Sequence, residues 1–177
     1  TPIAEYIYST ASAHGKRCQA LGGAKNHAIV MPDADMDNAV AQLLGAAFGS
    51  SGERCMALSV AVAVGDAAAD LLVSKMAEAM KTLKIGPCHD ANNDFGPVIT
   101  KQHQQKVFGY IDSAENQGAT IVVDGRNPSV TGHENGFYVG GTLIDQVTPE
   151  MESYDAEIFG PVLQVVRVDT MQQAMDL

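Results

Sequence analysis

The stretch GERCMALSVAVAV, residues 52–64, decides how this sequence folds. Its second half, Leu58–Val64, is an uncharged run rich in valine and alanine, which predicts a strand buried on both faces of a parallel sheet. Its first half is a polar loop that carries a single cysteine, Cys55. Because loops at strand ends are where rigid scaffolds display reactive groups, the stretch joins the fold to a candidate chemistry.

Helices with one apolar face are expected on either side of this strand. Upstream, Asp35 is placed as the N-cap of a helix that Gly49-Ser50-Ser51-Gly52 ends. Downstream, Asp66 is expected to cap a second helix, which Gly86-Pro87 ends. Their apolar residues recur at helical spacing: Met36, Val40, Leu43, Leu44 and Ala47 in the first, and Leu72, Met76, Ala79 and Leu83 in the second.

The rest of the sequence continues the alternation. Further helices are expected from Ile3 to Gly15, from Thr100 to Gly118, which is its C′ glycine, and after Thr170. Short strands are expected over 17–21, 28–31, 121–123, 137–143 and 162–168, with a turn at 22–23 and polar loops over 88–98 and 124–136. Helices that alternate with apolar strands predict an α/β domain with a mostly parallel sheet.

Composition argues against several classes of partner. The 177 residues are 46% hydrophobic, which is enough for one domain with a real core. The formal net charge is −10 with only 11 Lys and Arg, which argues against nucleic acid and anionic membrane surfaces. No apolar run approaches the roughly 18 residues of a spanning helix, and no signal peptide is recognisable. The start at Thr1-Pro2 and the end at Leu177 within an expected helix suggest a fragment of a longer polypeptide.

The three cysteines, Cys18, Cys55 and Cys88, are too few and too scattered for a disulfide framework, which favours a reducing compartment. No pair has C-x-x-C spacing, and Cys88-His89 has no further ligands close in sequence. The sequence therefore predicts no metal site.

Three stretches are candidate sites, and each has an ordinary alternative. Cys55, beside an arginine that favours its thiolate, is a candidate nucleophile or a buried structural cysteine. The glycine pair at 22–23 lets a cofactor approach the backbone or simply forms a turn. Glu157 can hydrogen-bond ribose hydroxyls and Phe159 can pack on a flat ring, or the segment is only a turn that leads into a strand.

Taken together, four motifs resemble the aldehyde dehydrogenase superfamily in order and spacing: LGGAKN (21–26), PDADMD (32–37), GERC (52–55) and EIFGPV (157–162). The resemblance runs the whole length of the chain. It implies a three-layer αβα catalytic domain that is truncated at both ends. Residues 1–20 would lead in from a cofactor domain, and residues 21–177 would form the nucleophile-bearing domain without its C-terminal part.

The resemblance also assigns roles to residues. It implies that Cys55 is the nucleophile, and that Glu157 and Phe159 contact the nicotinamide riboside of NAD. It places the backbone of Leu21 and Gly22 beside the nicotinamide. The cofactor domain and the side-chain amide that completes the oxyanion hole would lie upstream of this chain.

Two departures from the family pattern point to one branch. Most hydrolytic members have a glutamate that activates water just before Leu-Gly-Gly, where this sequence has Ala20. Most members also have a glutamine in the motif that reads GERC (52–55) here. With these features, QALGGAKNH (19–27) and GERCMA (52–57) resemble the CoA-acylating methylmalonate-semialdehyde dehydrogenases. The resemblance implies oxidation of malonate or methylmalonate semialdehyde to acetyl-CoA or propanoyl-CoA, with NAD as cofactor and coenzyme A as co-substrate in valine catabolism.

Arg54 is the candidate for binding the substrate carboxylate, because a planar guanidinium can hold one bidentately. The alternative is a salt bridge to Glu53 or another neighbour. The full-length protein is expected to be a homo-oligomer, without nucleic acid or membrane partners, in a bacterial cytoplasm in preference to a mitochondrial matrix. The isolated chain is expected to make no NADH.

Three other functions stay open. The first is a different, hydrolytic aldehyde dehydrogenase. The second is a cysteine hydrolase that pairs Cys55 with one of five scattered histidines, none of which has a telling position in the sequence. The third is a non-catalytic assembly module.

Overall fold

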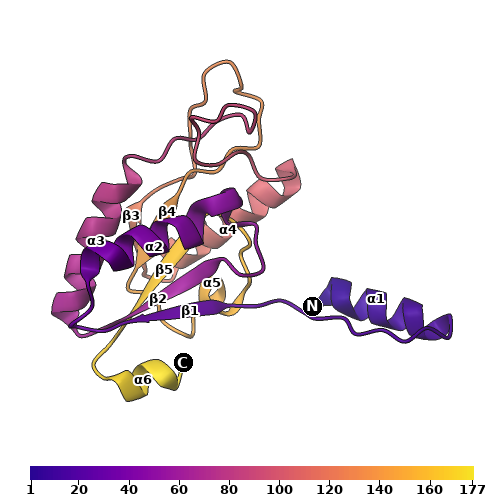
Figure 1. The fold of residues 1–177 in the computed structure, drawn as a ribbon, viewed down its shortest axis with the longest axis horizontal. Coiled ribbons are helices and arrows are strands. Elements are labelled where there is room, and N and C mark those ends of the chain that lie inside the picture. Colours follow the sequence, from indigo (N-terminus) through magenta and orange to yellow (C-terminus); the bar gives the residue numbers. More distant parts are fainter.

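Five strands form one sheet in the computed structural model, which describes all of residues 1–177 (Figure 1). Their order across the sheet is β1-β2-β5-β4-β3. The pairs β1–β2, β2–β5 and β5–β4 are parallel, and β3 pairs with β4 in the antiparallel direction. The predicted mostly parallel sheet is therefore confirmed. The bounds are Asn26–Val30 (β1), Leu58–Val64 (β2), Thr120–Val123 (β3), Thr142–Asp145 (β4) and Val162–Val168 (β5).

Helices cover both faces of this sheet, which gives the expected three layers. One face is covered by α2 (Met36–Phe48) and α3 (Asp66–Met80), and the other by α4 (Lys101–Asn116), α5 (Glu152–Asp155) and α6 (Met171–Met175). In β2 the residues alternate between the two cores: Ala61 and Ala63 pack toward α2 and α3, and Val60, Val62 and Val64 pack toward α4. All five are at most 4% exposed, so the predicted strand is buried on both faces.

Three of the predicted helix starts are confirmed by their capping bonds. The side chain of Asp35 accepts a hydrogen bond from the Asn38 N–H, and that of Thr100 accepts one from the His103 N–H, both at 3.1 Å. Thr170 forms a capping box with Gln173. These bonds satisfy backbone N–H groups that the first turn of a helix leaves without partners.

The prediction for α3 was wrong at both ends. Gly65, with φ +86°, is the N-cap, and Asp66 is the first helical residue. The helix ends at Met80, well before Gly86-Pro87. The chain leaves the helix there because residue 84 pairs with the following loop: the Lys84 N–H donates to Asp94 Oδ2 at 2.7 Å, and the Asp94 N–H donates to Lys84 O at 2.8 Å.

Two predicted strands also differ. Residues 17–21 are not a strand, because no neighbouring strand lies beside them to pair with. The strand expected over 137–143 begins only at Thr142. Upstream of it, the Gly140 N–H donates to Gly125 O at 2.8 Å, and a Cβ on Gly125 would lie 2.1 Å from Gly140 O. This close backbone contact holds residues 137–141 against the loop of Gly125 and keeps them out of the sheet.

Helix α1 (Pro2–Ala13) stands apart from the three layers at the end of the chain that leads into β1 (Figure 1). None of its residues is buried, and Ile3 and Tyr6 are 71% and 69% exposed. The structure contains no helix with both the length and the hydropathy needed to cross a membrane.

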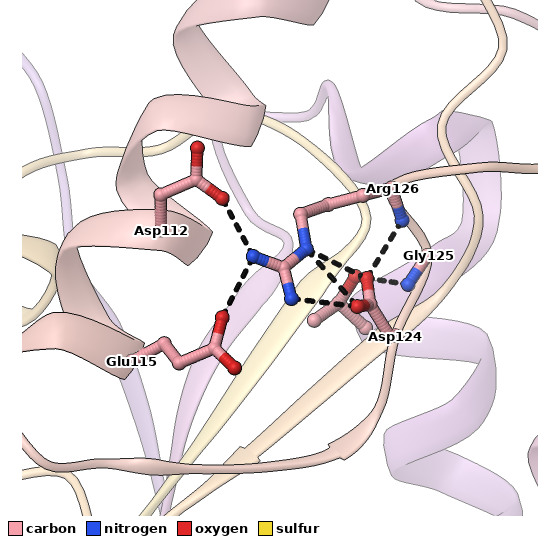
Figure 2. Close-up of polar contacts among 6 residues, drawn as sticks. Asp112, Glu115, Asp124, Gly125 and Arg126 are labelled. Atoms are coloured by element: carbon pink, nitrogen blue, oxygen red, sulfur yellow. Dashed lines mark hydrogen bonds and ion pairs between the residues drawn. The ribbon is translucent and has the colours of Figure 1, made fainter.

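An arginine fixes α4 to the loop that follows β3 (Figure 2). Arg126 Nη1 lies 2.6 Å from Asp112 and 2.8 Å from Glu115, both on α4, while Nε and Nη2 bind the carboxylate of Asp124. The hydrogen bonds from Arg126 hold the pKa of Asp124 below its usual range. We call these four residues the Arg126 clamp.

Candidate active site

Three motifs singled out from the sequence, LGGAKN, GERC and EIFGPV, lie at the amino ends of three parallel strands. Asn26 begins β1, Cys55 precedes β2 by three residues, and Glu157 and Phe159 precede β5. Because β1, β2 and β5 are neighbours in the sheet, the three stretches meet at one edge. Ligands of open α/β sheets usually bind at the carboxyl ends of the strands, so the site lies at the less common end.

The loop before Cys55 has an unusual backbone. Ser50, Ser51 and Gly52 have φ of 54°, 56° and 69° in succession. Non-glycine residues rarely adopt this left-handed conformation, which persists where the surroundings enforce it. Ser51 is anchored by a buried hydrogen bond from its Oγ to Gly96 O at 2.7 Å, and a Cβ on Gly52 would lie 2.1 Å from Gly160 O. The loop is therefore pressed against the turn that contains Gly160.

Cys55 is exposed, so the alternative of a buried structural cysteine is wrong. Its carbonyl accepts a hydrogen bond from Asn26 Nδ2 at 2.9 Å, and the same amide donates to Ala57 O at 2.9 Å. The Cys55 backbone N–H has no acceptor within the protein. Asn26 thus fixes the backbone at Cys55 and at Ala57, while the Cys55 thiol and N–H stay free. Asn26 belongs to the LGGAKN motif, and its contact with the Cys55 loop is not evident from the sequence.

Arg54 makes neither of the salt bridges considered from the sequence. Its Nη2 donates to Gly45 O at 2.8 Å and to Ala46 O at 3.0 Å, which lie in the last turn of α2. A cation at a helix C-terminus is favourable there. The other two guanidinium nitrogens make no hydrogen bond to the protein, and the side chain is exposed. Arg54 is anchored on one side and can still offer donors to an anion.

Glu157 and Phe159 lie on the turn that leads into β5. Phe159 has φ +57°, and 38% of it is exposed. The glycine pair lies beside this turn: a Cβ on Gly23 would lie 2.6 Å from Glu157 Oε2. Glu157 is partly buried, and the absence of a side chain at position 23 leaves room beside its carboxylate in an open cleft, as contact with a ribose hydroxyl requires. The exposed Phe159 ring offers a flat apolar surface, so these residues fit a nicotinamide nucleotide.

The predicted turn at 22–23 is wrong, because residues 16–25 form no turn and run on to β1. The Gly23 N–H donates to Thr1 Oγ1 at 3.2 Å. Leu21 is 81% exposed and Gly22 is exposed, so the backbone of this segment is open to a ligand. Ala20 precedes them and is partly buried.

Lys25 is a residue of the site that the sequence analysis missed. Its Nζ donates to Ser153 O at 2.7 Å and to Ala156 O at 2.6 Å, which anchors the segment just before Glu157. Burial lowers the pKa of Lys25 to about 8, although the nearby carboxylates of Asp155 and Glu157 act to raise it. Lys25 and Glu157 also line an open cleft beside Gly23.

The histidines form no pair with Cys55. His14 and His27 bond to the carbonyls of Thr10 and Lys25, and His27 also bonds to the Tyr154 hydroxyl. His103 Nε2 lies 2.6 Å from Phe159 O. None of the five hydrogen-bonds to the Cys55 thiol, so a cysteine hydrolase gains no support from this geometry.

Comparison with known proteins identifies the family of the chain independently of this geometry. The aldehyde dehydrogenase family model matches residues 1–177. The malonate-semialdehyde dehydrogenase of Pseudomonas aeruginosa is 62% identical over 177 residues, which is 100% of this chain and 36% of that protein. The malonate-semialdehyde dehydrogenase of Halalkalibacterium halodurans is 52% identical over 99% of the chain and 36% of that protein. The chain therefore spans about a third of the length of these relatives.

Solved structures agree with this result. The crystal structure of methylmalonate-semialdehyde dehydrogenase from Oceanimonas doudoroffii matches with a TM-score of 0.95 and 83% identity, over 99% of this chain and 36% of that one. Betaine aldehyde dehydrogenase from Staphylococcus aureus, in complex with NAD+, matches with a TM-score of 0.92 and 30% identity, over 99% and 35% of the two chains.

Proposed function

This chain belongs to the aldehyde dehydrogenase family, and we propose that it supplies the nucleophile for CoA-acylating oxidation of malonate or methylmalonate semialdehyde in a protein as long as its relatives. The observation that carries the proposal is the exposed Cys55 on a strained loop that packs against the turn of Glu157 and Phe159. One edge of the sheet thus brings a free thiol to the residues that fit a nicotinamide nucleotide.

The chemistry begins at Cys55. Its thiolate adds to the aldehyde carbon, and the electron pair of the carbonyl bond moves to oxygen. The free Cys55 N–H is one donor for this oxyanion. When the oxyanion collapses, the hydrogen on the same carbon leaves as hydride and a thioester to Cys55 remains. NAD, when bound, supplies the hydride acceptor, and Glu157 and Phe159 would hold its ribose and ring.

Release of the acyl group is proposed to need CoA. Ala20 stands where hydrolytic relatives carry a base, and an alanine cannot take a proton from water. A thiol ionises far more readily than water, so the CoA thiolate can displace Cys55 without that base. After the oxidation, the bond to the carboxylate of the malonate-type acyl group breaks, CO2 leaves and a proton takes its place on carbon, which gives acetyl-CoA or propanoyl-CoA.

Arg54 is proposed to bind the carboxylate of the semialdehyde. It is adjacent to Cys55, its charge is anchored at the end of α2 through Nη2 alone, and Nη1 and Nε remain for an anion. A simple aldehyde such as propanal has no group for it to bind. Acid-bearing substrates are therefore the class that this loop favours.

Residues 1–20 are proposed to lead in from a cofactor-binding domain. Helix α1 buries none of its residues against the sheet domain, and its exposed Ile3, Tyr6 and Ile7 form an apolar surface that another domain would cover. Without that domain, the chain alone is expected to make no NADH. We also propose, separately, that the full-length protein is a homo-oligomer in the cytoplasm.

The experiment compares malonate semialdehyde with propanal on the full-length protein, with and without CoA, by the absorbance of NADH. We expect sustained turnover of the semialdehyde only with CoA. The variant Ala20→Glu should gain turnover without CoA, because it restores a carboxylate that can activate water. Equal turnover of the wild type with and without CoA would favour the second candidate, a hydrolytic aldehyde dehydrogenase.

A further inference from the structure

One imidazole contacts both halves of the proposed site. His103 lies in the first turn of α4, and its side chain is 20% exposed. Its Nε2 is 2.6 Å from Phe159 O and 3.6 Å from Glu53 Oε1. Phe159 belongs to the turn before β5, and Glu53 lies two residues before Cys55.

Phe159 depends on contacts of this kind because its backbone is left-handed. A bulky residue keeps a positive φ only where its surroundings hold it. A carbonyl can only accept a hydrogen bond, so Nε2 of His103 carries the proton and donates to Phe159 O. The two rings also meet edge to face, with centroids 6.4 Å apart and planes at 67°.

The neighbouring residues restrict the same turn. Val107 lies one helical turn after His103 on α4, and a Cβ on Gly160 would lie 2.7 Å from it. On the other side, Gly52 packs on Gly160 O. Glu53 is itself held: its side chain is 11% exposed, and Oε1 accepts the Ile99 N–H at 3.4 Å. A shift of Phe159 would therefore also displace the neighbouring Gly160 against Gly52 and so move the Cys55 loop.

We propose that His103 is a positioning residue that holds Phe159 in its left-handed conformation, at a point where this turn packs against Glu53 and Gly52 of the Cys55 loop. It touches no reacting atom. The inference rests on the proposed function for the role of the Phe159 ring as a surface for the nicotinamide. Its consequence is that NAD affinity depends on the hydrogen bond from His103 to Phe159 O.

The test measures NAD binding to the full-length protein by titration calorimetry. His103→Leu removes the donor and should weaken binding about tenfold, the equivalent of one hydrogen bond. His103→Gln, whose amide can donate to the same carbonyl, should restore most of the affinity. His89→Leu, the same change at an exposed histidine in the loop between α3 and α4, should bind NAD as the wild type does. Should the leucine variant not fold, His103→Asn gives the same test, because its shorter amide does not reach the carbonyl.

A second arm separates positioning of Phe159 from a general loss of structure. Glycine adopts a positive φ without strain, so in a Phe159→Gly background the His103→Leu change should weaken NAD binding by less than about twofold. An equal loss in both backgrounds would overturn the inference, as would wild-type affinity in His103→Leu. If the wild type itself bound no NAD, the proposed function would fail together with the inference. If the wild type bound NAD and His103→Leu bound it with the same affinity, the inference would fail while the proposed function stood.

Discussion

The Cys55 loop and the Arg126 clamp each contain an arginine, but the two guanidinium groups differ in how many of their nitrogens are bound within the chain. In the clamp, all three guanidinium nitrogens of Arg126 meet carboxylates of the chain itself (Figure 2). At the Cys55 loop, Arg54 uses only Nη2, and the Cys55 N–H has no acceptor. The loop also has three successive left-handed residues. Full pairing is the mark of a region that stabilises the fold, whereas free groups on a strained backbone mark a region prepared for a ligand.

The largest expected effect is at the cysteine. Cys55→Ser in the full-length protein should lower kcat for the semialdehyde by at least ~10³-fold, because a serine hydroxyl without a base is a poor nucleophile at neutral pH. The free energy of unfolding, measured by urea denaturation, should change by no more than about 0.5 kcal/mol, since the side chain is exposed and makes no hydrogen bond. Cys88→Ser, at the other exposed cysteine, is the matched control and should keep full activity. Retained NADH formation in Cys55→Ser would remove the cysteine from the mechanism.

The next effect distinguishes the two arginines. Arg54→Leu should raise KM for malonate semialdehyde by about ten- to a hundredfold, the cost of a lost charged hydrogen bond, and should change KM for propanal much less. The KM of Arg54→Lys for malonate semialdehyde should lie between those of the wild type and Arg54→Leu, because lysine keeps the charge but cannot bind a carboxylate bidentately. Steady-state kinetics on both aldehydes measures this. Equal losses for both aldehydes would mean that Arg54 only supports the end of α2.

Lys25, beside Glu157 in the candidate site, should make the stability of the protein depend on pH. With its pKa lowered from 10.5 to about 8 by burial, Lys25 binds fewer protons in the folded than in the unfolded chain between these values. The free energy of unfolding should therefore rise with pH across this window, by at most about 1.4 kcal/mol per pH unit. Lys25→Met should lose this rise, as seen by urea unfolding at pH 8 and at pH 10. If the variant and the wild type had the same pH dependence, the buried position of this ammonium would be wrong.

The smallest effect should come from the clamp. Arg126→Met should lower the free energy of unfolding by about 1 kcal/mol, since the three carboxylates around it are about half exposed. Both kcat and KM should stay as in the wild type. The pKa of Asp124 is held below its usual 3.8. The contribution of the clamp is thus present above about pH 4 and is lost as the pH falls further, and the variant should lack this acid-dependent loss. A change in KM for NAD or aldehyde would show that the clamp and the Cys55 loop are not separate.

The sequence predicted the fold where local chemistry alone decides it. The caps at Asp35, Thr100 and Thr170 and the bounds of β2 and β5 could be identified because each depends on neighbours along the chain. The failures depend on distant contacts. The late start of β4 follows from the contact of Gly125 with Gly140, and the end of α3 follows from the pairing of residues 84 and 94.

The same distinction applies to the site. Motif order singled out Cys55, Glu157 and Phe159, and the structure brings their segments together at one edge of the sheet. No pattern revealed that Lys25 binds two carbonyls more than 120 residues away, or that His103 binds Phe159 O 56 residues away. Such bonds arise only when the sheet is assembled, so a single sequence carries no local trace of them.

The central claim, that Cys55 carries the acyl group and CoA removes it, has a direct test. The full-length protein is mixed with malonate semialdehyde and NAD without CoA, quenched in acid, digested and examined by peptide mass spectrometry. We predict an acyl group on the peptide that contains Cys55, and its transfer to CoA when CoA is added before the quench. NADH formation with an acyl group on another residue, or with none on Cys55, would contradict the account.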